Sequence, residues 1–179
     1  MDYIFPTGLM GALILIAGAA WPDPKKIKHP VKSVKNWLLA TGGLTMLIYS
    51  VMNFLQGGPV FFIFLQSLVV IASILMMLNI PDTINSPIII ICGIALSIWS
   101  ISLFGNYNTL FFIAGLSGIG LGYVFKMATL RRSAALTLGG ILIALFSYFE
   151  ANWIFFWLNV FFAIFSAYYL YKAASRENL

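Results

Sequence analysis

The sequence predicts an all-α integral membrane protein with seven transmembrane helices, arranged as two parallel three-helix repeats joined by a linker helix. Composition, the spacing of the apolar runs and an internal recurrence of residues lead to this prediction. Of the 179 residues, 61% are hydrophobic and only 8% are charged, whereas a soluble domain is about half apolar and about a quarter charged. So few charges cannot cover a globule with polar surface, which excludes a soluble enzyme, a disordered chain and a nucleic-acid-binding module.

Seven apolar runs approach the length of about 20 residues that a helix needs to cross the hydrocarbon of a bilayer. Prolines, glycines and polar residues separate the runs, with a loop expected over 81–87. The link at 150–152 is so short that the last two helices should be antiparallel neighbours. Because lysines follow the first run rather than precede it, we expect a retained helix and not a signal peptide. The runs cover residues 4–21, 36–53, 59–80, 87–104, 109–125, 133–149 and 153–171.

The positive charges gather after the first, fifth and seventh runs. Seven spans place these three regions on one side of the bilayer, so the positive-inside rule predicts an outside N-terminus and a cytoplasmic C-terminus, in the cell (inner) membrane. We therefore interpret the net charge of +5 as an orientation signal, with lipid and not nucleic acid as the partner. The alternative is that the basic loops bind anionic lipid or a partner protein.

The residue types that carry catalysis are sparse. One cysteine, Cys92, and one histidine, His29, exclude a disulfide framework and a multi-histidine metal site. The five acidic residues lie in expected loops and tails, with Glu150 nearest to a helix. We expect no enzyme activity, no metal and no cofactor, and the lack of an intramembrane acid argues against proton coupling.

Residues of the first three runs recur in order in the last three. The segment 8–11 is echoed by 115–118, 41–44 by 138–141, and 62–66 by 155–159. The single run between the triplets makes the second triplet run in the same direction as the first, as in a parallel repeat about the membrane normal. We divide the chain into a first repeat over 1–80, a linker helix over 81–108 and a second repeat over 109–179.

On these features the chain resembles the SWEET and SemiSWEET transporters of the PQ-loop superfamily and the PnuC transporters of vitamin precursors, which are built from such three-helix units. The first half carries the closest likeness, and 58–78 also resembles the N-terminal module of lipid-A-disaccharide synthase. The chain departs from the SWEET pattern in lacking hinge prolines in the second, fifth and sixth runs. The residues similar to the family's are Pro22 with Asp23 in place of a glutamine, Lys32 to Lys35, Gly43, Tyr49 and Pro59.

Gln66 and Asn159 are the strongest polar groups within long apolar runs, at equivalent places in the two triplets. A buried amide in lipid is costly unless it finds a partner, so we expect both to point between the triplets near mid-membrane, where repeat transporters bind substrate. An amide suits a neutral solute because it both donates and accepts hydrogen bonds. The alternative is that the amides only join helices. The remaining predicted substrate-binding residues are Phe62, Phe155, Trp157, Ser73 and Ser166.

The sequence thus predicts a small facilitative transporter for a small neutral polar solute, such as a sugar or a nucleoside-like vitamin precursor. The alternative is a non-transporting accessory subunit or a lipid-interacting module, which the missing hinge prolines favour. Gly118 and Gly122 have the spacing of a close helix contact. We expect this contact within a triplet, and the alternative is a contact between copies in a homo-oligomer.

Overall fold

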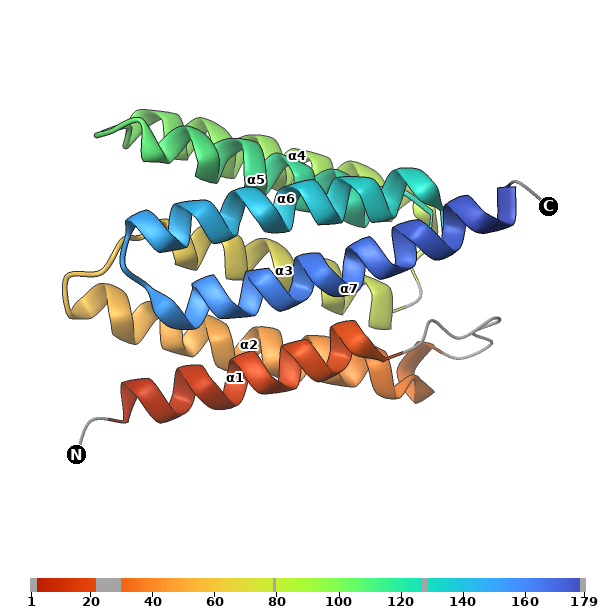
Figure 1. Cartoon of the computed structure of the whole chain (residues 1–179), viewed down its shortest axis with the longest axis horizontal. Coiled ribbons are helices and arrows are strands. Elements are labelled where there is room, and N and C mark those ends of the chain that lie inside the picture. The colour runs from red at the N-terminus through yellow and green to blue at the C-terminus, as the bar shows by residue number, and fades with distance from the viewer. Residues whose placement is uncertain (1–2, 22–29, 79, 127–128, 178–179) are drawn as a thin grey trace. The chain divides into compact units, whose positions relative to one another are not determined.

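All regular structure in residues 3–21, 30–78, 80–126 and 129–177, the part of the chain described by this computed structural model, is helical (Figure 1). This confirms the predicted all-helical class. The elements are α1 (Ile4–Ala20), η1 (Pro30–Lys32), α2 (Val34–Leu55), α3 (Phe61–Met77), α4 (Asp82–Ser102), α5 (Asn108–Val124), α6 (Leu130–Phe149) and α7 (Trp153–Glu177).

Among the described residues, four helices are long and apolar enough to cross a membrane, which is compatible with an integral membrane protein. They are α2, α4, α6 and α7. The apolar helices α1, α3 and α5 have 17 residues each and are therefore about 26 Å long, slightly less than the roughly 30 Å of bilayer hydrocarbon. The basic residues inside helices lie near the ends, at Lys35 in α2, at Arg131 and Arg132 in α6, and in the last turns of α7.

The fourth helix begins earlier than predicted. It starts at Asp82 and contains Pro87, so the loop expected over 81–87 is wrong from residue 82 onward. Proline breaks helices because it has no N–H to donate to the carbonyl four residues before it. Since Pro87 lies in the second turn, only the bond to the Thr83 carbonyl is lost, and the helix continues on both sides.

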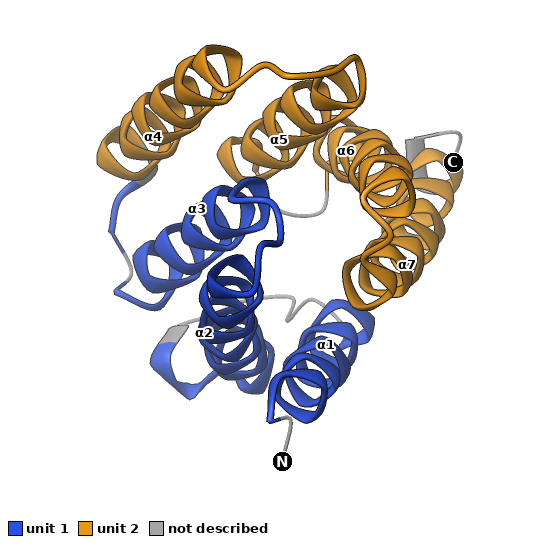
Figure 2. Cartoon of the chain, turned by 90° about the vertical axis from the view of Figure 1, so that its left-hand side faces the viewer, with its two compact units in different colours: residues 1–81 blue, residues 82–179 orange. Residues whose placement is uncertain are grey.

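The chain divides into two compact units, residues 1–81 and 82–179 (Figure 2). In the first unit α2 packs against both α1 and α3, and η1 contacts α2 and α3. In the second unit α6 packs against both α5 and α7, and α4 packs on α5. The helix expected to be a separate linker thus belongs to the second unit, and the predicted pairing of the last two helices is confirmed.

Glycines bring α1 and α2 into close contact in the first unit. A Cβ built on Gly42 would lie 2.8 Å from the backbone nitrogen of Leu15, and one on Gly11 would lie 3.0 Å from that of Met46. Such distances exclude any larger side chain without movement of the backbone. A Cβ on Gly18 would meet Leu39 at 3.1 Å, so close packing extends along the whole helix pair.

The pair α5 and α6 repeats these contacts in the second unit. A Cβ on Gly139 would lie 2.7 Å from the backbone nitrogen of Ile119, and one on Gly115 would lie 3.1 Å from that of Ile143. Gly122 likewise approaches Leu136. The glycines predicted to pack helices closely therefore do so within the second unit.

The links that follow α2 and α6 share one backbone motif. In the first unit Gly58 N donates to Asn53 O and Gly57 N donates to Phe54 O, both at 2.9 Å. In the second unit the corresponding pairs are Asn152 to Ser147 at 2.9 Å and Ala151 to Tyr148 at 3.0 Å. This pattern is the Schellman motif, in which the residue after the helix cap takes a left-handed conformation, here with φ of 91° at Gly57 and 52° at Ala151.

Candidate functional site

Gln66 and Asn159 are buried at similar places in α3 and α7. Gln66 is 2% exposed and Asn159 is 5% exposed. No charged residue occurs in α3, so the Gln66 amide is the most polar side chain of that helix. Burying an amide in an apolar environment destabilises a protein by several kcal/mol unless the amide forms hydrogen bonds. The hydrogen-bond partners of the two amides therefore determine whether their burial is favourable.

The two amides differ in their hydrogen bonding. Asn159 Nδ2 donates to the carbonyl oxygen of Phe155, one turn earlier in α7, at 2.8 Å. Gln66 Oε1 is fully buried and has no hydrogen-bond partner among the described residues. The large majority of buried side-chain polar atoms in proteins have a hydrogen-bond partner, so the unpartnered oxygen of Gln66 is an exception.

The two predicted serines, Ser73 and Ser166, lie two helical turns after the amides in α3 and α7 and are also buried. Ser73 is 1% exposed, and its Oγ has no partner among the described residues. Ser50 of α2 is equally buried, yet its Oγ donates to Met46 O at 2.7 Å. Helical serines normally make this bond to the carbonyl four residues back, which Ser73 does not do.

One face of α3 carries Gln66 and Ser73 towards α2. Val69 and Val70 flank Gly43 of α2, with 3.4 to 3.5 Å between their methyl groups and a Cβ built on that glycine. At about 100° per residue, Gln66 and Ser73 both project between Val69 and Val70 around the helix axis. The two polar groups therefore lie on the side of α3 that meets α2, on either side of the Gly43 contact.

The same arrangement holds for α7 and α6. A Cβ on Gly140 would lie 3.2 Å from Phe162 and 3.3 Å from Ala163. Asn159 and Ser166 project between these two residues around the axis of α7. Each amide and its serine thus share a face with the contact to the middle helix of their own triplet.

The predicted aromatic residues are divided between a buried and an exposed set. Phe62 and Phe155 are completely buried, one turn before the two amides. Trp157 is 54% exposed and projects about 160° away from Asn159 around α7. The structure therefore groups the two phenylalanines with the amides and does not bring Trp157 to that face.

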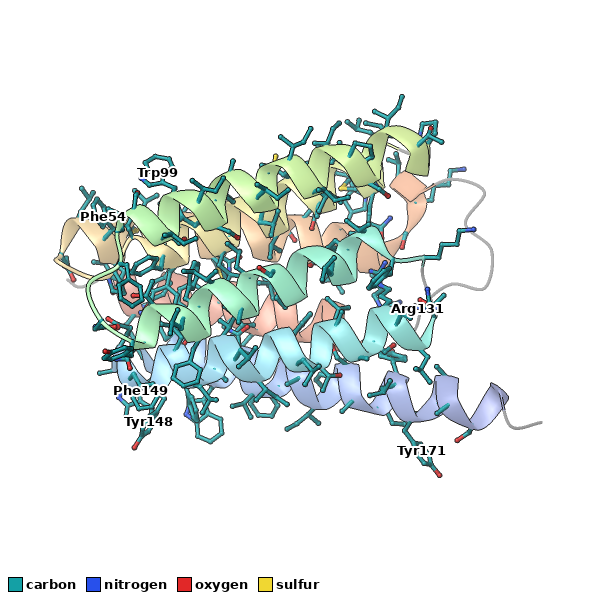
Figure 3. All side chains as sticks on the ribbon, turned by 90° about the horizontal axis from the view of Figure 1, so that it is seen from above. Phe54, Trp99, Arg131, Tyr148, Phe149 and Tyr171 are labelled. Atoms are coloured by element: carbon teal, nitrogen blue, oxygen red, sulfur yellow. The ribbon has the colours of Figure 1, made fainter. Side chains whose placement is uncertain are left out.

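The turn between α6 and α7 carries an aromatic cluster that the sequence analysis missed as a unit. The rings of Tyr148, Trp153 and Phe156 contact one another with centroids 5.7 to 5.9 Å apart, and Phe156 contacts Trp157 at 5.1 Å. In Figure 3 Tyr148 and Phe149 lie at one end of α6, and Arg131 lies at the other. The dense aromatic run over 148–157 was the available signal, and such clusters are typical of helix ends at a membrane interface.

Glu150 caps α6 beside this cluster. Partial burial raises the pKa of its carboxyl above the ordinary value of 4.5. It is the one acidic group near a helix end that the sequence analysis singled out, and its position at the cap keeps it outside the helical segments.

The basic ends of the helices form local bonds to backbone carbonyls. Lys35 Nζ donates to Trp21 O at 3.0 Å, which joins the two ends of the first basic loop. Arg132 donates to Phe125 O at 3.4 Å and lies 5.9 Å from the ring centre of Tyr123. These contacts tie basic residues to helix ends in both units.

No family model matches the chain, and neither a curated protein nor a solved structure matches it. Among the described residues, no group of three or more histidine, cysteine or acidic side chains could hold a metal ion. The resemblance to SWEET and PnuC transporters stays a prediction, as does the expectation that Gln66 and Asn159 face each other between the triplets.

Proposed function

We propose that this protein is a small facilitative membrane transporter for a small neutral polar solute, such as a sugar or a nucleoside. All seven helices cross the bilayer in this proposal, with the N-terminus outside and the C-terminus in the cytoplasm. The two triplets, α1 to α3 and α5 to α7, form a parallel repeat and move against each other. Lipid is the surrounding partner, and copies of the chain can associate through lipid-exposed helices.

The repeat is supported by contacts that recur at matching positions in each unit. Gly42 against Leu15 corresponds to Gly139 against Ile119, and the Schellman links after α2 and α6 correspond as well. Gly43 meets Val69 and Val70 of α3, and Gly140 meets Phe162 and Ala163 of α7. Each residue of the second pair lies 93 positions after its counterpart in the first, and the same spacing relates Gln66 to Asn159. Recurrence of both contacts and spacing favours two copies of one structural unit.

The contacts favour a different register for α1 and α5 from the one that the sequence suggests. Gly11 packs as Gly115 does, and Gly18 packs as Gly122 does, which is a shift of three residues from the match of 8–11 with 115–118. Three residues are nearly one helical turn, so the same face is presented in either register. Glycine spacing alone does not distinguish the two.

The observation that carries the transport proposal is the buried Gln66 with its unpartnered oxygen. A polar atom that is buried without a partner is expensive, and such costs are retained at functional sites, where a ligand supplies the missing bond. A neutral solute is favoured because no charged residue lies in α3 or in the middle of α7 to balance a charge. The site chemistry therefore fits hydroxyl or amide donors.

Uptake into proteoliposomes tests this function. The purified protein is reconstituted, and uptake of radiolabelled glucose and uridine is followed against protein-free liposomes. We expect wild-type uptake to saturate, and Gln66→Leu and Asn159→Leu each to abolish it while the protein stays folded. Gly93→Ala in α4 is the matched control, because a Cβ at Gly93 would meet no atom within 4 Å.

Wild-type liposomes that take up neither probe faster than empty liposomes would contradict the transport proposal. The accessory or lipid-interacting alternative predicts that outcome, with lower thermal stability in both amide variants. Retained uptake in the amide variants would assign these residues to helix packing instead.

A further inference from the structure

We propose that the turn between α6 and α7 holds a binding site for a quaternary ammonium group, formed by the rings of Tyr148, Trp153 and Phe156 and the carboxylate of Glu150. This group is carried by the choline headgroup of a phospholipid and by free choline. The site belongs to the second unit alone and takes a cation, so it is independent of the transport of a neutral solute.

The three rings are spaced so that one cation can contact all of them. Their centroids form a nearly equilateral triangle, with 5.9 Å between Tyr148 and Trp153, 5.7 Å between Trp153 and Phe156, and 5.9 Å between Tyr148 and Phe156. A cation about 4 Å above the middle of this triangle would lie about 5 Å from each centroid, which is inside the roughly 6 Å range of a cation–π interaction.

The rings are inclined to one another and are accessible. The plane of Trp153 makes angles of 84° with Tyr148 and 86° with Phe156, and the planes of Tyr148 and Phe156 meet at 53°. Stacked rings would cover each other's faces, whereas inclined rings can direct their negative faces toward one point. Tyr148 is 53% exposed and Trp153 is 55% exposed, so there is open space beside them for a trimethylammonium group.

Glu150 supplies a negative charge that no basic residue in its part of the chain balances. It is the only charged residue between Arg132 and Lys172, and Figure 3 shows Arg131 at the opposite end of α6 from Tyr148. Partial burial raises the pKa of the Glu150 carboxyl, because the charged form is poorly solvated there. A bound cation would offset this penalty by its opposite charge.

The surroundings favour a quaternary ammonium over a primary one. A primary ammonium has three N–H donors that need acceptors, but Asn152 Oδ1 already accepts from Phe155 N at 3.1 Å, and the carbonyls of Ser147 and Tyr148 accept the backbone bonds of the turn. A quaternary ammonium has no N–H group, and its methyl groups can pack on ring faces. Aromatic cages of this kind recognise choline and methylated lysine.

Titration with choline tests the site in the full-length protein solubilised in dodecyl maltoside, an uncharged detergent. The tryptophan emission should change saturably with choline, because Trp153 would contact the bound cation. It should not do so with 3,3-dimethylbutan-1-ol, which has the shape of choline but no charge. This pair of probes separates recognition of the cation from partitioning of an apolar group.

Variants identify the groups that bind the cation. Glu150→Gln and Tyr148→Leu should each raise the apparent Kd for choline by about twofold to thirtyfold, whereas Tyr148→Phe should leave it unchanged because the ring remains. Trp99→Leu is the matched control, since Trp99 is 57% exposed and no charged residue lies between positions 83 and 125. The melting temperature of each variant shows that it is folded.

Nanodiscs distinguish the two sources of the group. If a phospholipid headgroup occupies the site, choline should change the emission in phosphatidylglycerol nanodiscs and have no effect in phosphatidylcholine nanodiscs. An equal effect in both would assign the site to free choline.

Three results would overturn the site: no response to choline, equal responses to choline and 3,3-dimethylbutan-1-ol, or an unchanged Kd in folded Glu150→Gln and Tyr148→Leu. The aromatic cluster would then serve only as an anchor of the helix ends at the membrane interface. Choline binding without solute uptake into liposomes would support the site and contradict only the transport proposal.

Discussion

Replacing Ala151 by glycine should stabilise the protein. Ala151 is the residue after the cap of α6 and has φ of 52°, in the left-handed region where a non-glycine residue pays about 1–2 kcal/mol. Glycine removes this strain but increases the freedom of the unfolded chain, which costs about 0.4–1 kcal/mol. The net gain is about 1 kcal/mol, and Ala151 is exposed, so loss of its methyl group removes no core packing.

Gly57 offers the reciprocal change at the matching link of the first unit. It has φ of 91°, and a Cβ there would meet no atom within 4 Å. Gly57→Ala therefore introduces backbone strain with no steric clash, and the free energy of unfolding should fall by about 1 kcal/mol. Ala151→Gly is thus expected to raise the free energy of unfolding and Gly57→Ala to lower it, because both positions have a left-handed backbone conformation.

Thermal melting of the detergent-solubilised protein measures both effects. A change of about 1 kcal/mol corresponds to about 2–4 °C for a chain of this size, with Ala151→Gly above the wild type and Gly57→Ala below it. A double variant should return close to the wild-type value, because the links are separate. A lower melting temperature for Ala151→Gly would refute the reasoning, since it would mean that the left-handed conformation is not populated at this link.

Three further outcomes are expected. Gly139→Ala should lower the free energy of unfolding by about 1–3 kcal/mol, because the added Cβ would press on the backbone of α5. Gly93→Ala is the control, because a Cβ there meets no atom within 4 Å, and it should change the free energy of unfolding by under about 1 kcal/mol. Urea or SDS titration measures both, and equal losses in the two variants would contradict the close contact at Gly139. The raised pKa of the Glu150 carboxyl means that the folded state favours the protonated form, so stability from this group is present below the unfolded pKa and is lost as pH rises through the folded pKa. Melting temperatures measured from pH 4 to pH 7, a range of about three units around the ordinary pKa, should show Glu150→Gln becoming more stable relative to the wild type as pH rises. If the difference in melting temperature between Glu150→Gln and the wild type shrinks instead, the raised pKa of Glu150 is wrong. Single cysteines at Lys32 and Arg131, in a background without other cysteines, should both react only with reagent added to the cytoplasmic side; labelling from opposite sides would exclude the seven-span topology.

The helical class and the number of helices could be predicted because they depend on local properties. Long apolar runs without charges can satisfy their backbone only as helices in lipid, and glycine, proline and polar residues mark the links between them. The predicted start of α4 lies five residues later in the chain than the observed start at Asp82. Pro87 was expected to begin that helix, and the structure places it in the second turn, because losing one early backbone bond does not prevent helix formation.

The positions of the two candidate site residues could be predicted from the sequence, but the hydrogen bonding of their side chains could not. Gln66 and Asn159 stand out in the sequence because polar groups are rare in their runs. The bonding of Asn159 to Phe155 O and the bare oxygen of Gln66 depend on side-chain conformation and on what packs nearby. Sequence therefore indicated equal roles, and only the atomic contacts reveal that the two amides differ.

The sequence by itself determined that seven apolar helices exist, where most of them begin and end, and which residues recur along the chain. Tertiary structure decided which glycines meet which helix, such as Gly11 of α1 against Met46 of α2 and Gly115 of α5 against Ile143 of α6. The physical reason is that helix formation and hydrophobicity follow from neighbours along the chain. Close packing depends on atoms that are distant in sequence. Residues three or four apart lie on the same face of a helix, so the sequence does not show which of them contacts the partner helix.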